Sequence, residues 1–337
     1  MATIDLGRVS ENSFFFADDP IVVTVIPNQF EDGGTFRQVA IKIKVDYVGD
    51  KENREYDFFL PAVDNATPVI GDVSSAIRST LAQWEYDADS IVVGSSVTYP
   101  HASFSVTAWE REMDTSGNVI NYPSSEQGPY RAYLGGVGEY SRFIHGEAYP
   151  QYNSESGRLE YPSGVEFAFT SKPVDEKFQY GQPRCTTSFN GTNVETSVSL
   201  ATVFPAPYNG LFLFVNRYGV FETISTIGRE SLGYEIRAER KSLSQPPSYA
   251  SNPIAIAHKQ GGGAVWQMSS GFVSREWADW YASEFLMARL YWMRHEGFWL
   301  PVTVEPDGDT VMVYDRSDPS LIAVNFIVRA AVSGSVR

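Results

Sequence analysis

The stretch of sequence that decides the fold is SREWADWYASEFLMARLYWMRHEGFWLPVTVE, residues 274–305. Ser274 is a favoured helix cap, and Glu276 lies where the positive end of the helix dipole favours a carboxylate. Large apolar residues then recur mostly at spacings of three and four, which predicts a helix with one apolar stripe. The stripe consists of Trp277, Trp280, Tyr281, Phe285, Ala288, Tyr291 and Trp292. Gly297 is expected to end this helix, and residues 298–304 are expected to form a strand.

So much aromatic surface on one helix has to be covered, either by a sheet of the same chain or by another subunit. One buried Trp removes about 150–250 Å² of surface from water, so its burial is a large stabilising term. We therefore treat aromatic residues of this helix, of a predicted hairpin turn and of a polar loop as candidate interface residues. They are Trp277, Trp280, Tyr281, Tyr218, Tyr149 and Tyr152.

Most of the remaining chain shows the period-two alternation that is typical of half-buried strands. The alternation is strict over residues 39–47 and recurs over 103–112 and 234–241. Two apolar segments flank Asn216-Arg-Tyr-Gly219, which predicts a hairpin over residues 209–225. A short amphipathic helix capped by Asp72 is expected over residues 72–84. These patterns predict a mainly β fold, built from antiparallel β-sandwich or barrel-like domains with a few short covering helices.

Composition divides the chain into two expected domains. Residues 1–112 are predicted to form an N-terminal β domain with one helix. Residues 113–130 contain Pro123, Gly128 and Pro129, which indicates a linker or an exposed loop. Residues 131–337 are expected to form a larger β domain that carries the aromatic helix near its end.

The charge balance limits the kinds of partner that the protein is expected to bind. The 41 Asp and Glu residues outnumber the 26 Lys and Arg residues, giving a net charge of −15, which disfavours specific binding to nucleic acid. No apolar run approaches the roughly 18–20 residues of a membrane span, and no signal peptide is recognisable. The single cysteine, Cys185, allows no disulfide framework and is expected to be a small buried residue. Synthesis and folding in a cytoplasm are therefore expected.

No stretch has the spacing of a known metal or phosphate motif. None of the four histidines lies in an HExxH or H-x-H pattern; they are His101, His145, His258 and His295. The glycine runs at 135–138 and 261–263 lack the Lys and Ser/Thr of a phosphate-binding loop, so turns or close backbone approaches are expected there. We expect no metal ion and no cofactor.

Two functions that need no sequence motif stay open, namely hydrolysis by a pair of carboxylates and stacking on sugars. Asp114-Thr-Ser-Gly117 differs from the aspartic-protease triplet by an inserted residue and is typical of a turn, so no catalytic role is expected there. A pair of carboxylates from separate strands could still serve a hydrolase, because the spacing of such pairs is spatial. Tyr149, Tyr152 and Tyr161 lie in a polar loop and could stack on sugars, although packing is the commoner role of such rings.

Five short segments resemble tail proteins encoded by phages and prophages of Bacteroidetes bacteria. They are LPA at 60–62, DVSSAIRS at 72–79, VEFAFT at 165–170, NRYGVFET at 216–223 and LPVTV at 300–304. The resemblance implies an all-β virion component near the tail end, similar in role to a distal tail or baseplate hub protein. It implies no catalytic residues.

Three hypotheses follow from the residues and the resemblance together. The first is a structural virion protein without enzymatic activity, assembled in the host cytoplasm into a homo-oligomeric ring, for example a hexamer, that contacts other tail proteins. The second is a carbohydrate-binding module that recognises a receptor for the same kind of particle. The third is a hydrolase acting on polysaccharide or peptidoglycan.

Overall fold

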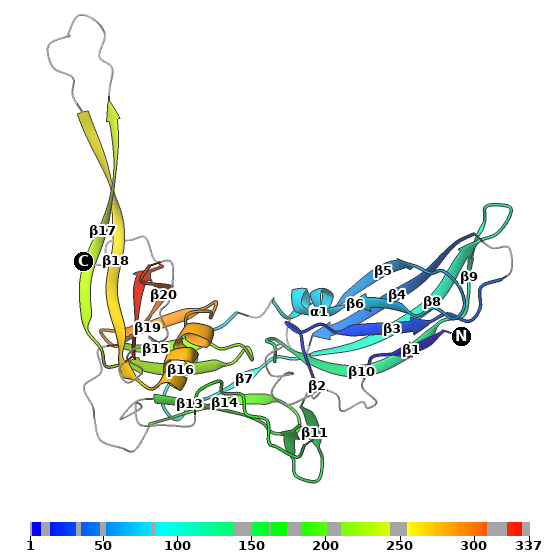
Figure 1. Ribbon diagram of the computed structural model, residues 1–337, viewed down its shortest axis with the longest axis horizontal. Helices are drawn as coiled ribbons and strands as arrows, with labels where there is room; N and C mark the ends of the chain where they lie inside the picture. The colour runs from blue at the N-terminus through cyan, green and yellow to red at the C-terminus, as the bar shows by residue number, and fades with distance from the viewer. Residues whose placement is uncertain are drawn as a thin grey trace, which may run out of the picture.

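The computed structural model describes residues 2–7, 14–31, 35–47, 52–82, 85–137, 150–161, 163–173, 183–200, 210–242, 255–308 and 322–331. The described chain is mainly β, with antiparallel pairing almost throughout and two short α-helices, which confirms the predicted fold class. Figure 1 shows two lobes side by side, with a long two-stranded ribbon projecting from the C-terminal lobe.

The N-terminal lobe is a β-sandwich. One sheet has the order β1 (Thr3–Asp5), β3 (Val22–Ile26), β6 (Val69–Asp72). The other has the order β2 (Phe14–Phe16), β10 (Ser125–Tyr133), β8 (Ala102–Met113), β4 (Thr35–Tyr47), β5 (Arg54–Pro61), with β9 (Val119–Asn121) on β8. The predicted alternation is confirmed in β4, where Val39, Ile41, Ile43 and Val45 point into the core between the two sheets.

Helix α1 (Ser74–Leu81) packs against this core through Ile77 and Leu81. The expected cap acts slightly differently from the prediction. Val73 is the flanking residue, while the Asp72 carboxylate accepts the Ser74 N–H at 2.9 Å and the Ile21 N–H at 3.1 Å. Asp72 therefore holds the start of the helix and the start of β3 together.

The predicted linker is part of the N-terminal sheet. Residues 113–130 hold the turn after β8, strand β9 and most of β10, and the first lobe extends to Tyr133. The Pro and Gly residues that suggested a linker lie between β9 and β10 and at a bulge between Gln127 and Tyr130. Such residues mark both bulges and linkers, so composition alone does not separate the two.

A small sheet lies under the C-terminal lobe and contains a strand from the first third of the chain. Its order is β13 (Pro183–Phe189), β14 (Val194–Leu200), β7 (Ser96–Tyr99), and a separate hairpin pairs β11 (Gln151–Asn153) with β12 (Arg158–Glu160). The 3-10 turn η1 (Ala88–Ser90) leads into β7.

The C-terminal lobe is one seven-stranded sheet with a helix against one face. The order is β16 (Phe221–Thr226), β15 (Gly210–Val215), β19 (Tyr291–His295), β20 (Phe298–Pro306), β21 (Ile322–Ala330), β18 (Ala255–Val273), β17 (Glu230–Ser242). Helix α3 (Arg275–Trp280) and the π-helical turn η3 (Tyr281–Phe285) share a core with all of these strands except β17. The glycine run at 261–263 lies within β18, not in a turn.

The predicted long helix is wrong beyond Phe285. Ser274 caps α3 as expected, accepting the Trp277 N–H, but Tyr291–His295 form strand β19 between β15 and β20. Glu296 and Gly297 both have positive φ, as in a two-residue hairpin turn, so Gly297 turns a hairpin and does not end a helix. The helical spacing of the aromatic residues continues by coincidence into a strand that buries Tyr291 and Met293 on one face.

Candidate functional site

The two lobes share side chains at their junction. In β2, Phe15 belongs to the sandwich core, whereas Phe14 and Phe16 belong to the aromatic core beneath the C-terminal sheet. Phe14 stacks on Tyr133 with ring centroids 4.3 Å apart. A strand that contributes to both cores joins the lobes more firmly than a flexible connection would.

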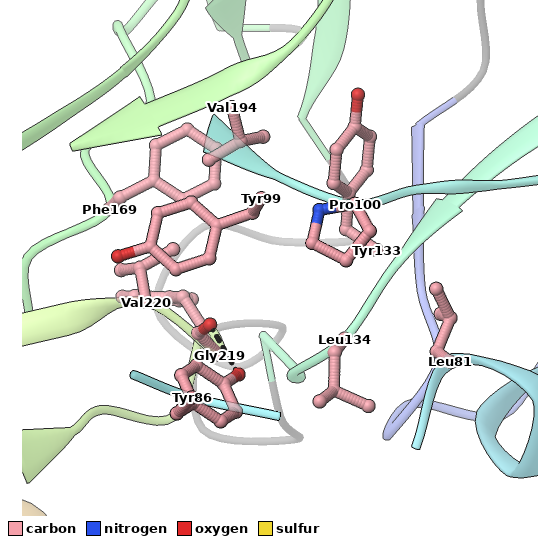
Figure 2. A pocket seen from close by; sticks show the side chains of 11 residues that line it. Leu81, Tyr86, Tyr99, Pro100, Tyr133, Leu134, Phe169, Val194, Gly219 and Val220 are labelled. Atoms are coloured by element: carbon pink, nitrogen blue, oxygen red, sulfur yellow. Dashed lines mark hydrogen bonds between the residues drawn. The ribbon is translucent and has the colours of Figure 1, made fainter. Parts of the chain in front are cut away.

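Two glycines let the lobes meet backbone to backbone. Gly135 and Gly219 both have positive φ, and a Cβ on either would overlap the main chain of the other turn. The Gly136 N–H donates to the Arg217 carbonyl at 2.7 Å, and the Tyr86 hydroxyl donates to the Gly219 carbonyl at 2.6 Å (Figure 2). We call this contact the glycine joint. Only glycine fits at both positions, because any side chain would push the two turns apart.

The pocket drawn in Figure 2 is a packed part of the core. Its free volume is only about 10 Å³, and the rings of Tyr99, Tyr133 and Phe169 lie in its wall. Burial raises the pKa of Tyr86 and of Tyr99, so both phenols stay neutral. The Tyr99 hydroxyl accepts the Phe221 N–H at 2.8 Å and contacts the Thr196 hydroxyl at 2.8 Å. This pocket has structural hydrogen bonds and no room for a ligand.

An open cavity of about 880 Å³ lies between the lobes, and we call it the interlobe groove. It is lined by the end of α1, the glycine joint and the turn after η3. Met287 and Arg289 are strongly exposed at its wall. Clefts between lobes are common binding places, so this groove is the first candidate for a small ligand.

The charged groups of the groove are already paired. Asp18 lies 3.4 Å from Arg78 and 3.9 Å from Arg289, and the Arg217 Nε–H donates to Glu284 at 2.8 Å. Asp19 accepts the Val137 N–H at 2.7 Å. A general acid or base needs access to substrate, and these carboxylates instead bind main-chain and guanidinium groups of the protein itself. The groove therefore offers a polar surface whose charged groups are engaged with one another.

A second cavity, of about 350 Å³, lies beside the buried Glu222. The Glu222 carboxylate accepts hydrogen bonds from Thr170 and Asn216, and Lys172 donates to the neighbouring Thr223 carbonyl. Cys185 is also in the wall, but burial raises the pKa of its thiol to about 12. A thiol with that pKa is a poor nucleophile at neutral pH. The sequence predicts a buried Cys185, and in the structure it is half-buried.

The candidate interface residues that the structure describes are mostly core residues. Trp277, Trp280, Tyr281 and Tyr218 are 1%, 4%, 2% and 9% exposed. The Trp280 indole donates to Ser171, and the Tyr281 hydroxyl donates to the Ser225 carbonyl. The aromatic surface of α3 is thus covered by the sheet of its own chain, and a contact between subunits would use other residues.

The tyrosine loop gives little support to sugar binding. Tyr152 is half-buried and packs edge-on against Phe189, while Tyr161 is buried against Phe167. Tyr149 lies outside the described residues. Two of the three rings therefore face the protein interior and form no exposed platform for stacking on a sugar.

The remaining candidates for chemistry have structural surroundings. The Asp114 carboxylate accepts the N–H groups of Ser116 and Asn118, as expected for a turn. His101 is buried against Tyr133 and His295 packs edge-on against Trp266, while the side chains of His145 and His258 lie outside the described part. Within the described ranges, no three His, Cys, Asp or Glu side chains converge as a metal site would require.

Comparisons leave the family open. No family model matches the chain, and no curated protein or solved structure matches it either. Among the described residues, no helix combines the length and apolarity that a membrane crossing needs.

The most unusual feature of the molecule is the β17–β18 ribbon, which sequence analysis did not single out. Strand β21 pairs with β18 only from Val265 to Val273. Beyond that point, residues 236–242 of β17 pair with 255–261 of β18, and no other described strand joins them. The ribbon leaves the lobe as a free two-stranded arm (Figure 1).

Proposed function

We propose that this protein is a structural subunit that assembles with copies of itself through the β17–β18 ribbon. The kind of particle we propose, a ring in a phage tail, comes from the resemblance of the five short segments. The ribbon is the single observation that carries the proposal of assembly. The ribbon extends away from the lobe and has two exposed strand edges. A monomeric enzyme has no evident need for either feature.

A two-stranded ribbon without further packing is expected to be only marginally stable in a single chain. An isolated hairpin is marginally stable in water at best, and independent stability needs a third strand or a packed face. Within the described residues, β17 is the edge of the seven-stranded sheet along its whole length. An exposed strand edge presents unpaired N–H and C=O groups, which are a template for contact with another chain. A neighbouring subunit would supply the missing contacts.

The charge of the ribbon also differs from that of the body. Residues 235–261 contain Arg237, Arg240, Lys241 and Lys259 against Glu235 and Glu239, a net charge of +2. The other residues contain 22 basic and 39 acidic side chains, a net charge of −17. Charges on an edge strand can also serve to block unwanted pairing. Opposite net charge on arm and body nevertheless favours the approach of one copy's ribbon to another copy's body.

The cavities do not favour an enzymatic function over the proposed structural one. The interlobe groove has its charged groups in ion pairs, and the Glu222 carboxylate beside the second cavity accepts internal hydrogen bonds. The glycine joint and the shared β2 strand hold the two lobes in a fixed relation, as a building block requires.

The proposal is tested by trimming the ribbon. In the trimmed variant, Asn-Gly replaces residues 235–263, so that Tyr234 and Ala264 remain the last paired positions. We expect the full-length protein to form a closed oligomer in sedimentation velocity and rings in negative-stain images. The trimmed variant is expected to stay monomeric and to keep a single cooperative thermal unfolding transition.

A matched control trims a different hairpin. Asn-Gly replaces residues 154–157, the exposed turn between β11 and β12, and assembly should be unaffected. A full-length protein that is monomeric at every concentration would contradict the proposal. A trimmed variant that still assembles would show that the ribbon is not the assembly element.

A further inference from the structure

The cavity of about 350 Å³ beside Glu222 lies where two sheets meet edge to edge. Strand β13 is an outer strand of the small sheet, and β16 is an outer strand of the seven-stranded sheet. The two strands lie next to each other (Figure 1), but within the described residues no register pairs them. Two edges that meet without pairing leave space between them, and residues 168–173 complete its wall. We call this space the edge cavity. Its volume is typical of sites that hold small organic ligands.

Basic groups outnumber acidic ones in the wall of the edge cavity. Its described part contains two cations, Lys172 and Arg184, and one carboxylate, Glu222. The side chains of Lys172 and Glu222 are 11% and 3% exposed, and their charged atoms are 4.0 Å apart. Two positive charges and one negative charge leave this wall with a surplus of one positive charge, in a protein whose net charge is −15. The cavity therefore favours an anion over a cation.

The Glu222 carboxylate is already engaged by its surroundings. One of its oxygens accepts a hydrogen bond from the Thr170 hydroxyl, and the other accepts one from the Asn216 amide at 3.1 Å. The Lys172 ammonium lies beside the same carboxylate. An ammonium has three N–H donors that rotate among nearby acceptors, so Lys172 can serve Glu222 and an anion together. An anion in the edge cavity therefore meets the two cations without displacing Glu222.

The uncharged part of the wall sets the remaining character of the ligand. Phe169, Pro173 and Phe221 contribute apolar groups, and both phenylalanines are buried, so packing holds their rings in place. A guanidinium such as that of Arg184 has a planar fork of donors that matches the two oxygens of a carboxylate. One negative charge on an apolar body thus suits a wall that has one surplus positive charge and aromatic sides.

We propose that the edge cavity binds a small monocarboxylate with an apolar body. The carboxylate lies between Lys172 and Arg184, and the apolar body lies against Phe169 and Phe221. The inference goes beyond the proposed function, because the site is inside one subunit and needs no contact between copies. A doubly charged phosphate fits less well, since the buried Glu222 lies beside the same cations and repels the second charge. A neutral ligand gains no charge-assisted hydrogen bond.

Benzoate is the probe for this site, because it joins one carboxylate to one aromatic ring, and benzamide is its neutral counterpart. Isothermal titration calorimetry of the full-length protein is expected to show one benzoate bound per chain. Benzamide is expected to bind at least about tenfold more weakly, because it lacks the charge that strengthens hydrogen bonds to the two cations. Inorganic phosphate is the third probe and is also expected to bind more weakly than benzoate.

Two variants remove binding for different reasons. Arg184→Gln removes one of the two cations and should weaken benzoate binding by roughly 10–100-fold, because a hydrogen bond to a charged group is lost. Thr186→Trp keeps every charge and fills the cavity from an exposed position of β13, so it should abolish binding. The matched controls are Arg289→Gln, in the wall of the interlobe groove, and Thr98→Trp, at an exposed position of β7 in the same small sheet. Both controls should bind benzoate as the wild type does.

Several results would overturn the inference. They are an absence of benzoate binding at up to about 10 mM, equal binding of benzamide, and tighter binding of phosphate. Unchanged benzoate binding by Arg184→Gln and Thr186→Trp would also overturn it. If Arg289→Gln weakens binding and Arg184→Gln does not, the ligand lies in the interlobe groove and the edge cavity is not its site.

The trimmed-ribbon variant separates this inference from the proposed function. It keeps the whole wall of the edge cavity, so it should bind benzoate as the full-length protein does, whether or not that protein assembles. A full-length protein that stays monomeric but binds benzoate contradicts the proposal of assembly alone. A full-length protein that assembles but binds no benzoate contradicts the carboxylate site alone.

Discussion

The N-terminal lobe packs one sheet against another, whereas the C-terminal lobe packs one sheet against a short helix, and their cores differ accordingly. Between the two N-terminal sheets the buried residues of β4 are β-branched or small except for Tyr47 at the end of the strand. At the centre of the C-terminal lobe, Phe285 contacts five other rings at centroid distances of 5.4–5.5 Å; they belong to Phe212, Phe214, Tyr281, Tyr291 and Phe326. Aliphatic chains interdigitate between flat faces, while large rings fill the uneven space between a sheet and a helix.

The two cores differ in which substitutions destabilise them most. A core of many small side chains loses little when one is trimmed, because the neighbours share the contact area. A core built around one ring loses several ring contacts at once when that ring is removed. The junction between the lobes is a third case, since it depends on the absence of side chains.

The largest effect is expected at the glycine joint, which couples the two lobes. Gly219→Ala should lower the free energy of unfolding by on the order of 5 kcal/mol, because the new Cβ would overlap the Leu134 carbonyl at a positive φ. Urea unfolding at pH 7 measures the loss. Gly117→Ala is the control: it has positive φ but open space, so about 1 kcal/mol is expected. Equal losses for Gly219→Ala and Gly117→Ala would mean that the two turns are not in close contact at the glycine joint.

The next effect tests the ring-centred core. Phe285→Ala should lower the free energy of unfolding by about 3–5 kcal/mol, because it removes a fully buried ring and leaves a cavity among its neighbours. Urea unfolding followed by near-ultraviolet circular dichroism reports the loss of ring packing. A loss below about 1.5 kcal/mol would show that the helix and sheet collapse onto the gap without cost.

A smaller, pH-dependent effect is expected in the N-terminal lobe. The carboxylate of Glu112 is buried in β8; burial raises its pKa, but hydrogen bonds from Tyr122 and the Glu31 N–H, with Arg37 nearby, outweigh this and lower the pKa below its usual 4.5. A lowered folded-state pKa stabilises the fold above pH 4.5 and ceases to do so as the pH falls through the folded value.

Glu112→Gln should therefore cost about 1–3 kcal/mol at pH 7. Below pH 4.5 the difference between Glu112→Gln and wild type should shrink as the wild-type carboxyl is protonated. Thermal unfolding midpoints across a pH series measure this trend. A difference that stays constant at low pH would exclude the carboxylate charge as its origin.

The smallest effect completes the comparison of the two cores. Ile41→Val removes one methylene group from the fully buried centre of β4 and should cost about 0.5–1.5 kcal/mol. Urea unfolding under the conditions used for Phe285→Ala gives the ratio between the lobes. If Ile41→Val costs as much as Phe285→Ala, the contrast between shared and ring-centred packing is wrong.

Local pattern was sufficient for much of the fold. Strict alternation predicted β4 and β8, and Asn216 to Gly219 predicted the turn between β15 and β16, where Gly219 has positive φ. These features depend on neighbouring residues alone. The serine cap of α3 was likewise visible, because its hydrogen bond reaches only three residues along the chain.

Features set by distant partners were not predictable. Tyr291 to His295 fit a helix by spacing, and only the gap between β15 and β20 makes them a strand. Gly135 and Gly219 are separated by 84 positions, so their contact leaves no local signal. The ribbon was missed because alternation reveals a strand but not whether anything pairs with its far edge.

Strand β7 has a practical consequence for work with fragments. It lies in the first third of the sequence, yet it completes the small sheet with β14, and its Tyr99 accepts the main-chain N–H of Phe221. A gene divided after residue 133 would leave the downstream product short of this strand and of the phenylalanines of β2. Neither half is expected to fold into a soluble product when expressed alone. A fragment that folds would have to contain residues 96–99 together with the C-terminal part, as a circular permutation could.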